Sequence, residues 1–471
     1  MSYPIWRWCC NGWTLTLLLS AAAVVWALWS PLPRASLAEQ AEAVESAPPD
    51  RAELAGFTQA ERRLGDDAPT GAGIVLGHVE GDPGQYLPRV DHHRYRRIDL
   101  RPRSGESEPL SHTDATARII YGPQGLAHGI REVHHFSSPH WLGGGYLRAG
   151  QSQPPADDRP RVFNHSWIGN DSGMNPAQTA HILRRIDYAI DRHGVVMSVG
   201  VNNNRNSRVP GLLASAYNVI AVGLADGASS SGGTNIEVEG RAKPDIVAPG
   251  TRTSYSTPVV TAAVARMLEA AGKLPEHAES ARRPETIKAL LMAGATKPWN
   301  WRQRDGQVLD DRLGAGVVHL DNALRILEAG RAKPNEVRSG SGWDLRMIQP
   351  GGRAIYRLDL DEPVEELSIM LTWHRRIDGR TVPHPTTGQP AWVDTPALAR
   401  FDLRVVHAGD EGSRLLADSL SEIDNVQHVH LTDAPAGDYH LVVSRREGGP
   451  AAPWPVAIAW RAGERVPYPG D

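Results

Sequence analysis

The stretch "NPAQTAHILRRIDYAIDRHGVVMSVGVNNN" (175–204) contains the pattern that decides the fold. Residues 175–191 have the pattern of a helix, and residues 194–201 form a nearly continuous apolar run, typical of a strand that is buried on both faces. A helix that leads directly into such a strand is the crossover unit of a parallel sheet. The stretch ends in asparagines, so polar side chains are expected at the carboxyl end of this strand.

The same alternation continues on both sides of this stretch. Strands are predicted at 73–79, 161–167 and 217–223, and helices at 256–271 and 284–294. We therefore predict an α/β fold with a mostly parallel sheet and helices on both faces. In such a sheet the chemistry belongs at the carboxyl ends of the strands.

Length and composition set the frame for this fold. With 471 residues, 41% hydrophobic and 22% charged, the chain is globular and long enough for two or three domains. Its 50 Lys and Arg against 54 Asp and Glu give a formal net charge of −4, and the sequence has no basic stripe that would track phosphates. Nucleic acid is not an expected partner.

The N-terminus resembles an export signal. Arg7 precedes an apolar run at 13–29, and the small residues Ser36 and Ala38 offer a cleavage site. Residues 1–38 therefore predict a protein that is exported to the periplasm or secreted. The alternative is an uncleaved membrane anchor, because the apolar run is nearly long enough to span a bilayer. Cys9 and Cys10 are the only cysteines, so the mature chain has no disulfide and no cysteine-based zinc site.

Four kinds of catalytic side chain follow one another along the chain. Glu80 follows the first strand, His112 lies in "SHTDATARIIYG" (111–122), Asn202 follows the strand at 194–201, and Ser254 precedes a helix. A carboxylate, a histidine, an amide and a serine are the groups that acyl transfer needs. Pro258 is expected in the first turn of the helix that begins near Ser254, where no intrahelical N–H is required.

Several motifs resemble those of one family, the subtilisin-like serine proteases, over about residues 69–330. These motifs are "KPDIVAPG" (243–250) with "TSYSTPVVTAAVARML" (253–268), "HTDATARIIYG" (112–122), "YNVIAVGLADG" (217–227) and "LGAGVVHLDNALRIL" (313–327). The resemblance implies a serine endopeptidase that hydrolyses protein or peptide substrates through an acyl-enzyme. It places the nucleophile at Ser254, the base at His112 and the oxyanion donors at Asn202 and the Ser254 backbone N–H.

The acid departs from the pattern of that family. The family ends its first strand in Asp-Thr/Ser-Gly, whereas this chain has Val79-Glu80-Gly81 followed by Asp82. Glu80 precedes His112 by 32 residues, and its additional methylene can offset a shift of one residue. We therefore predict Glu80 as the acid that orients His112, with Asp82 as the alternative.

Two further departures bear on the function. Val201 intervenes between Gly200 and Asn202, and only three residues separate Gly250 from Ser254, so part of the wall of the substrate cleft is expected to be missing. The alternative function is a catalytically impaired binding or scaffold protein at the cell surface that has kept the fold.

No cofactor is expected. No carboxylate follows the histidine-rich segments 91–97 and 133–140 at ligand spacing, and adjacent histidines on an extended segment point to opposite faces. Calcium is a common structural ion in the resembled family, but no ligand motif assigns it here.

A second domain is predicted from about residue 338. Six runs with the period of strands and no helical pattern between them predict an antiparallel β-sandwich at 338–465, with Trp373 and Trp460 in its core. It resembles the jelly-roll-like modules of secreted subtilases, which implies that it packs on the protease domain or binds an extracellular surface. The expected organisation is a signal or anchor at 1–38, a linker or short helix at 39–68, a peptidase domain at 69–330 and the sandwich.

Overall fold

The computed structural model describes residues 50–468, except 170, 305 and 410–411. The predicted export segment, with Cys9 and Cys10, lies outside the described residues. Within the described part of the chain, no helix has both the length and the apolar character needed to cross a membrane.

The first half of the chain is built on a seven-stranded sheet in which every neighbouring pair is parallel. In spatial order its strands are β11 (Ile246–Ala248), β8 (Ile220–Leu224), β7 (Val196–Gly200), β6 (Val162–His165), β1 (Val75–Glu80), β5 (Glu132–Ser137) and β3 (Asp99–Pro102). The strands predicted from the apolar runs are β1, β6, β7 and β8. The sheet is thus the parallel α/β sheet predicted from the sequence.

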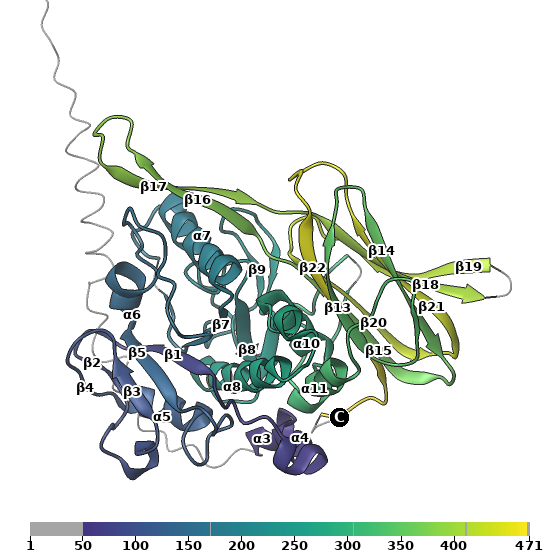
Figure 1. Ribbon diagram of the computed structural model, residues 1–471, viewed down its shortest axis with the longest axis horizontal. Coiled ribbons are helices and arrows are strands. Elements are labelled where there is room, and N and C mark those ends of the chain that lie inside the picture. Colours follow the sequence, from purple (N-terminus) through teal and green to yellow (C-terminus); the bar gives the residue numbers. More distant parts are fainter. Residues whose placement is uncertain (1–49, 170, 305, 410–411, 469–471) are drawn as a thin grey trace, which may run out of the picture.

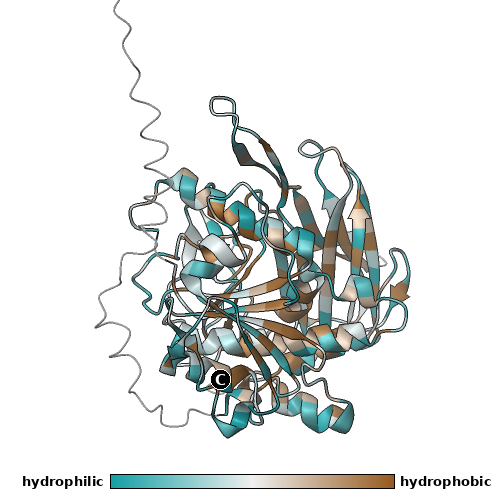
Figure 2. Ribbon diagram, turned by 60° about the vertical axis from the view of Figure 1, so that its left-hand side comes forward, coloured by the Kyte–Doolittle hydropathy of each residue, from teal (hydrophilic) through white to brown (hydrophobic). Residues whose placement is uncertain are grey.

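Helices cover both faces of this sheet (Figure 1). One face carries α5 (Ser111–Ile120), α8 (Thr253–Gly272), α10 (Pro284–Ala293) and α11 (Leu320–Glu328), whose apolar residues share one core with the sheet. The other face carries α7 (Pro176–His193), which packs into a separate core. Side chains alternate between the two: Leu76 of β1 enters the first core and Val79 the second. In Figure 2 the strands of this sheet are largely hydrophobic, as parallel strands covered on both faces should be.

Residues 50–68, part of the segment predicted as a linker or short helix, form α3 (Arg51–Leu54), α4 (Phe57–Leu64) and a 3-10 turn. Phe57 and Ala60 are fully buried in the core that also contains α11. Strands β2 (Gln85–Leu87) and β4 (Glu108–Pro109) pair beside the sheet, and β9 (Gly232–Thr234) pairs with β10 (Arg241–Lys243). Short helices follow β5 and α8, namely α6 (Ser138–His140) and α9 (Ala278–Ala281).

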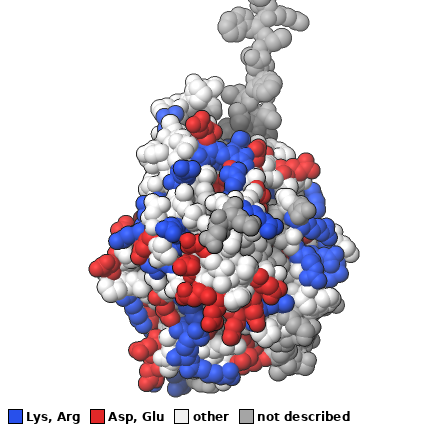
Figure 3. All heavy atoms as spheres, turned by 90° about the vertical axis from the view of Figure 1, so that its right-hand side faces the viewer, with Lys and Arg blue, Asp and Glu red and all other residues white. Residues whose placement is uncertain are grey.

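The second half of the chain is a β-sandwich of two sheets. One sheet has the order β12 (Val337–Arg338), β14 (Arg353–Leu360), β21 (Gly437–Arg445), β18 (Phe401–Gly409), β19 (Gly412–Ser419). The other has the order β13 (Gly342–Ile348), β22 (Trp454–Gly463), β15 (Val364–Thr372), β20 (Val426–Ala434). All pairs are antiparallel except β12 with β14. Trp373 and Trp460 are each 1% exposed in the core between the sheets, as predicted. On the face that Figure 3 shows, acidic and basic side chains are interspersed.

A hairpin that the sequence analysis did not predict extends from the sandwich over α7 (Figure 1). It consists of β16 (Arg376–Pro383) and β17 (Pro390–Ala397). Asp394 of β17 pairs with His181 (2.6 Å) and Arg184 (3.1 Å) of α7. The ring of Trp392 packs edge to face against Tyr188 of the same helix.

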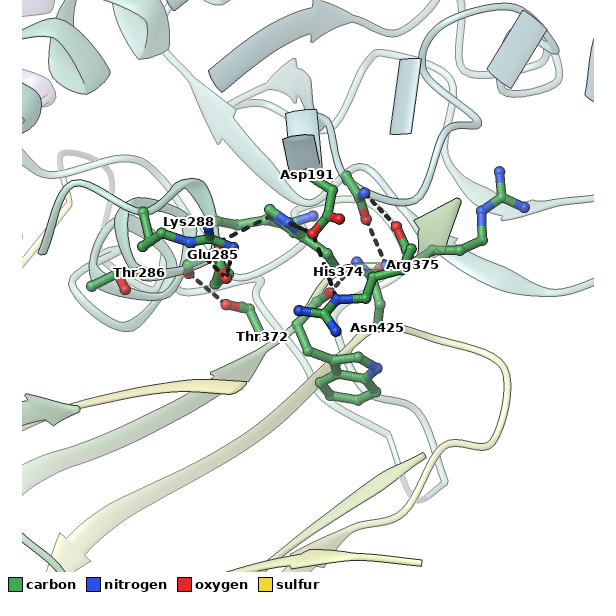
Figure 4. Close-up of polar contacts among 12 residues, drawn as sticks. Asp191, Glu285, Thr286, Lys288, Thr372, His374, Arg375 and Asn425 are labelled. Carbon is green, nitrogen blue, oxygen red and sulfur yellow. Dashed lines mark hydrogen bonds and ion pairs between the residues drawn. The ribbon is translucent and has the colours of Figure 1, made fainter. Parts of the chain in front are cut away.

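Polar contacts seal the interface at the base of this hairpin (Figure 4). Arg375 binds Asp187 of α7 through Nε (2.7 Å) and Nη2 (2.6 Å), and it also pairs with Glu237. His374 lies between Asp191 of α7 (3.2 Å) and Glu285 of α10 (3.5 Å). The side chains of Arg375, Asp187 and His374 are at most 5% exposed, so the sandwich completes the interior of the α/β half.

Candidate active site

Glu80 ends β1, and its side chain points toward α5. The side chain is 2% exposed, and its Oε2 lies 3.1 Å from Nδ1 of His112. The hydroxyl of Thr116, one turn further along α5, donates to the other carboxylate oxygen at 3.3 Å. The carboxylate is therefore held by two side chains of the same helix.

His112 occupies the second position of α5, and its side chain is 27% exposed. Because Nδ1 bonds to Glu80, the second ring nitrogen, Nε2, remains for a reaction. The imidazole ring stacks toward Tyr255, the neighbour of Ser254, with centroids 6.1 Å apart and planes inclined by 29°. Helices α5 and α8 pack against each other, which brings the histidine and serine segments together.

The two groups of this pair shift each other's pKa. Burial alone would raise the pKa of Glu80, but the charge and hydrogen bond of His112, with a smaller contribution from His78, lower it to about 2. Burial likewise acts to lower the pKa of His112, yet Glu80 outweighs burial and raises it above its ordinary value. The acid is therefore ionised at neutral pH, and it favours the protonated imidazolium.

Ser254 is the second residue of α8 and is 7% exposed. The helix begins at Thr253, earlier than the predicted start at residue 256, so Pro258 lies beyond the first turn and the expectation for it was wrong. Pro258 lacks the N–H that would bond to the carbonyl of Ser254, four residues earlier. The carbonyl of Ser254 therefore lacks this helical hydrogen bond.

The first turn of α8 leaves one N–H available. The N–H of Thr253 donates to Oδ1 of Asn203 at 2.7 Å, and those of Tyr255 and Ser256 donate to the carbonyl of Arg252. Within the described part of the chain, the backbone N–H of Ser254 has no such partner. A free N–H at a helix N-terminus is suited to an anionic oxygen.

Asn202 and Asn203 follow β7 but have different surroundings. The backbone of Asn202 is fixed by Ser230, which accepts from its N–H at 2.9 Å and donates to its carbonyl at 2.8 Å. The side chain of Asn202 lines a cavity of about 560 Å³ that Gly169 and Ile236 also line. Asn203 instead bonds to both N–H and hydroxyl of Thr253, the residue before Ser254. The sequence analysis missed Asn203, and its only signal was its place in the asparagine run.

Asp82 lies in the turn that follows β1. Its side chain is exposed, and its carbonyl accepts from the N–H of Gln85 at 3.0 Å. Gly81 adopts a φ of +57°, and a Cβ there would lie 2.1 Å from the carbonyl oxygen of Gln85, so this turn requires glycine. Of these two carboxylates, Glu80 is the one that bonds to His112.

Of the two histidine-rich segments, 133–140 places His134 and His135 in the interior, whereas in 91–97 His92 is half-buried and His93 is exposed. His134 bonds to Glu132 at 2.8 Å, and His135 bonds to the hydroxyl of Tyr121 at 3.2 Å. Among the described residues, no three His, Cys, Asp or Glu side chains are grouped so that they could hold a metal ion.

One family model matches part of the chain. Residues 137–316, which include Asn202, Asn203 and Ser254 but neither Glu80 nor His112, match the Peptidase_S8 model of the subtilase family. No curated protein matches the chain.

Three solved structures show similarity to parts of the chain. MycP1 without its N-terminal propeptide is 19% identical, with 59% of this chain and 97% of MycP1 covered and a TM-score of 0.38. The MycP3 protease from the type VII (ESX-3) secretion system is 18% identical, with 59% and 88% covered and a TM-score of 0.37. Fervidolysin from Fervidobacterium pennivorans, a keratinolytic enzyme related to subtilisin, is 14% identical, with 86% and 79% covered and a TM-score of 0.35. The match of residues 137–316 to the subtilase family model, together with the parallel sheet, shows that this part of the chain is similar to subtilases.

Proposed function

We propose that the protein is an exported serine endopeptidase with the triad Glu80, His112 and Ser254. The observation that carries the proposal is the hydrogen bond of 3.1 Å between a fully buried Glu80 and a partly exposed His112. This pair lies beside the helix whose second residue is Ser254. A buried acid, a histidine open to solvent and a serine at a helix N-terminus are the parts that acyl transfer needs.

In this mechanism Ser254 attacks the scissile carbonyl, and Nε2 of His112 takes the hydroxyl proton. The bond from Glu80 to Nδ1 fixes the tautomer in which Nε2 is free to accept that proton. His112 then gives the proton to the leaving amine, and water hydrolyses the acyl-enzyme by the same steps. Glu80 stays ionised throughout and stabilises the imidazolium.

The negative charge on the carbonyl oxygen requires donors. The free N–H of Ser254 supports its role as one of them. Asn202 was the second donor expected from the sequence, but Asn203 has the geometry that favours this role, because its amide contacts the residue next to Ser254. Replacing Asn203 by alanine should lower kcat by about 10²–10³ if it is the donor.

The matched variant Asn202→Ala decides between the two amides. It should leave kcat nearly unchanged if Asn203 is the donor, and the reverse outcome would assign the role to Asn202. Because Asn203 also caps α8, its Ala variant must be compared at equal folded concentration, measured by its melting curve.

Labelling by a fluorophosphonate tests the activity itself. Folded protein should be captured covalently at Ser254, and the Ser254→Ala variant should not. Mass spectrometry of the labelled peptide identifies the serine. Absence of labelling on folded wild-type protein would favour the second candidate, a scaffold protein that has lost the chemistry.

Location and the role of the second domain follow from other observations. The N-terminal signal or anchor, residues 1–38, supports export to the periplasm or outside the cell. The subtilase match of residues 137–316 supports protein or peptide substrates. The contacts of the hairpin with α7 support a sandwich that packs on the protease domain, and binding of an extracellular surface by its other faces remains a proposal.

A further inference from the structure

A continuous series of hydrogen bonds leads from Glu80 into the interior of the α/β half. Thr116 Oγ1 donates to Glu80 Oε1 at 3.3 Å and lies 3.0 Å from Nε2 of His78. The other nitrogen of His78, Nδ1, lies 3.2 Å from the hydroxyl of Tyr121. That hydroxyl in turn lies 3.2 Å from Nε2 of His135. Four side chains thus form a hydrogen-bonded series behind the carboxylate. Their elements are β1 (His78), α5 (Thr116), the C-terminal end of α5 (Tyr121) and β5 (His135).

These four side chains are sealed from solvent. His78, Thr116 and His135 have no exposed area, and Tyr121 is 1% exposed. A polar chain of this kind is costly in an apolar interior unless each hydrogen has an acceptor. The positions of the hydrogens can therefore be deduced from the contacts.

The deduction starts at His135, the residue of the hydrogen-bonded series farthest from Glu80. Nδ1 of His135 is buried and has no hydrogen-bond partner among the described residues, so the hydrogen of the neutral ring belongs on Nε2. His135 then donates to the Tyr121 oxygen, and the Tyr121 hydroxyl donates to Nδ1 of His78. Burial lowers the pKa of His135 well below its ordinary value, which agrees with a neutral ring.

The same reasoning continues to the acid. Since Nδ1 of His78 accepts, its hydrogen is on Nε2, which donates to Thr116 Oγ1 and lies 3.6 Å from Glu80 Oε1. The Thr116 hydroxyl also lies within reach of the carbonyls of His112 (3.2 Å) and Thr113 (3.1 Å). A carboxylate is the strongest of these acceptors. Every donated hydrogen in the series from His135 to Thr116 then points toward Glu80.

We propose that His78, Thr116 and Tyr121 are positioning residues that hold Oε1 of Glu80, so that Oε2 is presented to His112. The inference rests on the proposed function of the Glu80–His112 pair. A glutamate needs such support, because its side chain has one more rotatable bond than an aspartate. The hydroxyl of Thr116, backed by His78, holds Oε1 and so removes that freedom. The other oxygen, Oε2, is left for His112.

Thr116→Val tests the link nearest the acid. It keeps the shape of the side chain and removes the hydroxyl, so we expect kcat/KM on a peptide substrate to fall by about tenfold or more, with KM little changed. Thr116→Ser keeps the hydroxyl and should restore most of the rate. Thr113→Val is the matched control, because the buried hydroxyl of Thr113 has no hydrogen-bond partner among the described residues.

The pH profile separates positioning from a general loss of structure. Glu80 raises the pKa of His112, so a misplaced carboxylate should move the acid limb of kcat/KM to lower pH in Thr116→Val. A variant that only lost stability would keep the limb of the wild type. His78→Leu should show the same shift, and His78→Gln should reduce it, because its amide N–H can replace the donor at Nε2.

Two outcomes would overturn different statements. The positioning role would be overturned if the wild type is active and both Thr116→Val and His78→Leu match it in rate and pH profile. A folded wild type that neither hydrolyses peptide nor reacts with a fluorophosphonate would overturn the proposed function itself.

Discussion

His112 and His374 both contact buried carboxylates, but only His112 has the setting of an active site. His112 bonds to Glu80 and keeps 27% of its side chain exposed beside the Ser254 helix. His374 contacts Asp191 and Glu285, but it is 3% exposed and closed between the two halves (Figure 4).

The difference lies in what surrounds each histidine. The ring of His112 stacks against Tyr255, the neighbour of Ser254. The backbone carbonyl of His374 accepts from the indole of Trp454, and its ring has acids on both sides. A histidine whose two ring nitrogens both face acids, such as His374, has a structural role. A histidine with one nitrogen on an acid and the other left for a reactant, such as His112, is a candidate base.

The largest expected effect separates the two histidines directly. Ser254→Ala and His112→Ala should each abolish hydrolysis without unfolding the protein, and the double variant should show no further loss, because the two residues act as one unit. His374→Ala should keep kcat/KM within about threefold and lower the melting temperature instead. Near-wild-type turnover in either single catalytic variant would refute the assignment.

The acid is the next test of the comparison. Glu80→Gln removes the charge and can present the wrong tautomer to His112, so turnover should fall by about 10²–10⁴ with little change in KM. Asp82→Asn, in the exposed turn, should cost almost nothing. If Asp82→Asn were the slower variant, the acid would be Asp82 and the turn would have to rearrange in the working enzyme.

Substitutions in the polar interface between the two halves, at Arg375, should lower the stability of the protein. Arg375→Met leaves the buried carboxylate of Asp187 without its cation, while Glu237 keeps Arg184, and we expect a loss of about 3–5 kcal/mol in the free energy of unfolding. Arg380→Met, at an exposed position of β16, is the control. Denaturant melts of both variants give the measurement, and equal stability would mean that the joint adds little.

The smallest effect is a shift in pH dependence. Hydrolysis requires neutral His112, so activity should fall as the pH decreases through its raised pKa, which lies above the ordinary 6.5. Glu80→Gln should move this midpoint to lower pH, because it removes the charge that favours the imidazolium. An unchanged midpoint in that variant would show that another group controls the acid limb.

The fold was predictable where burial leaves a local pattern. The runs that predicted β1, β6, β7 and β8 are apolar because both faces of those strands are covered. Strands β14 and β21 lie in the region predicted as a β-sandwich, and their burial alternates or nearly alternates along the strand. The hairpin β16–β17 was missed, because most of its residues are half-buried or exposed and contact α7 through polar groups.

The candidate site was predictable in part, from the spacing of its motifs and not from a burial pattern. Motif spacing placed Glu80 near His112, and the structure brings them to 3.1 Å. His78 gave no signal, since a histidine within an apolar strand has the pattern of any core residue. Contacts such as the one between Arg375 and Asp187, 188 residues apart, depend on the packing of two domains, and no local sequence pattern reports them.

The joint between the halves also imposes an order in time. A polypeptide is synthesised from its N-terminus, so Glu80, His112 and Ser254 are all present before residue 375 exists. Until then Asp187 has no cation to bury against, and α7 cannot complete its packing. The α/β half is thus expected to stay incomplete, and inactive, until residue 375 has been synthesised and has packed against α7. Fluorophosphonate labelling of ribosome-bound chains of increasing length measures this delay, and labelling before residue 375 has emerged would contradict it.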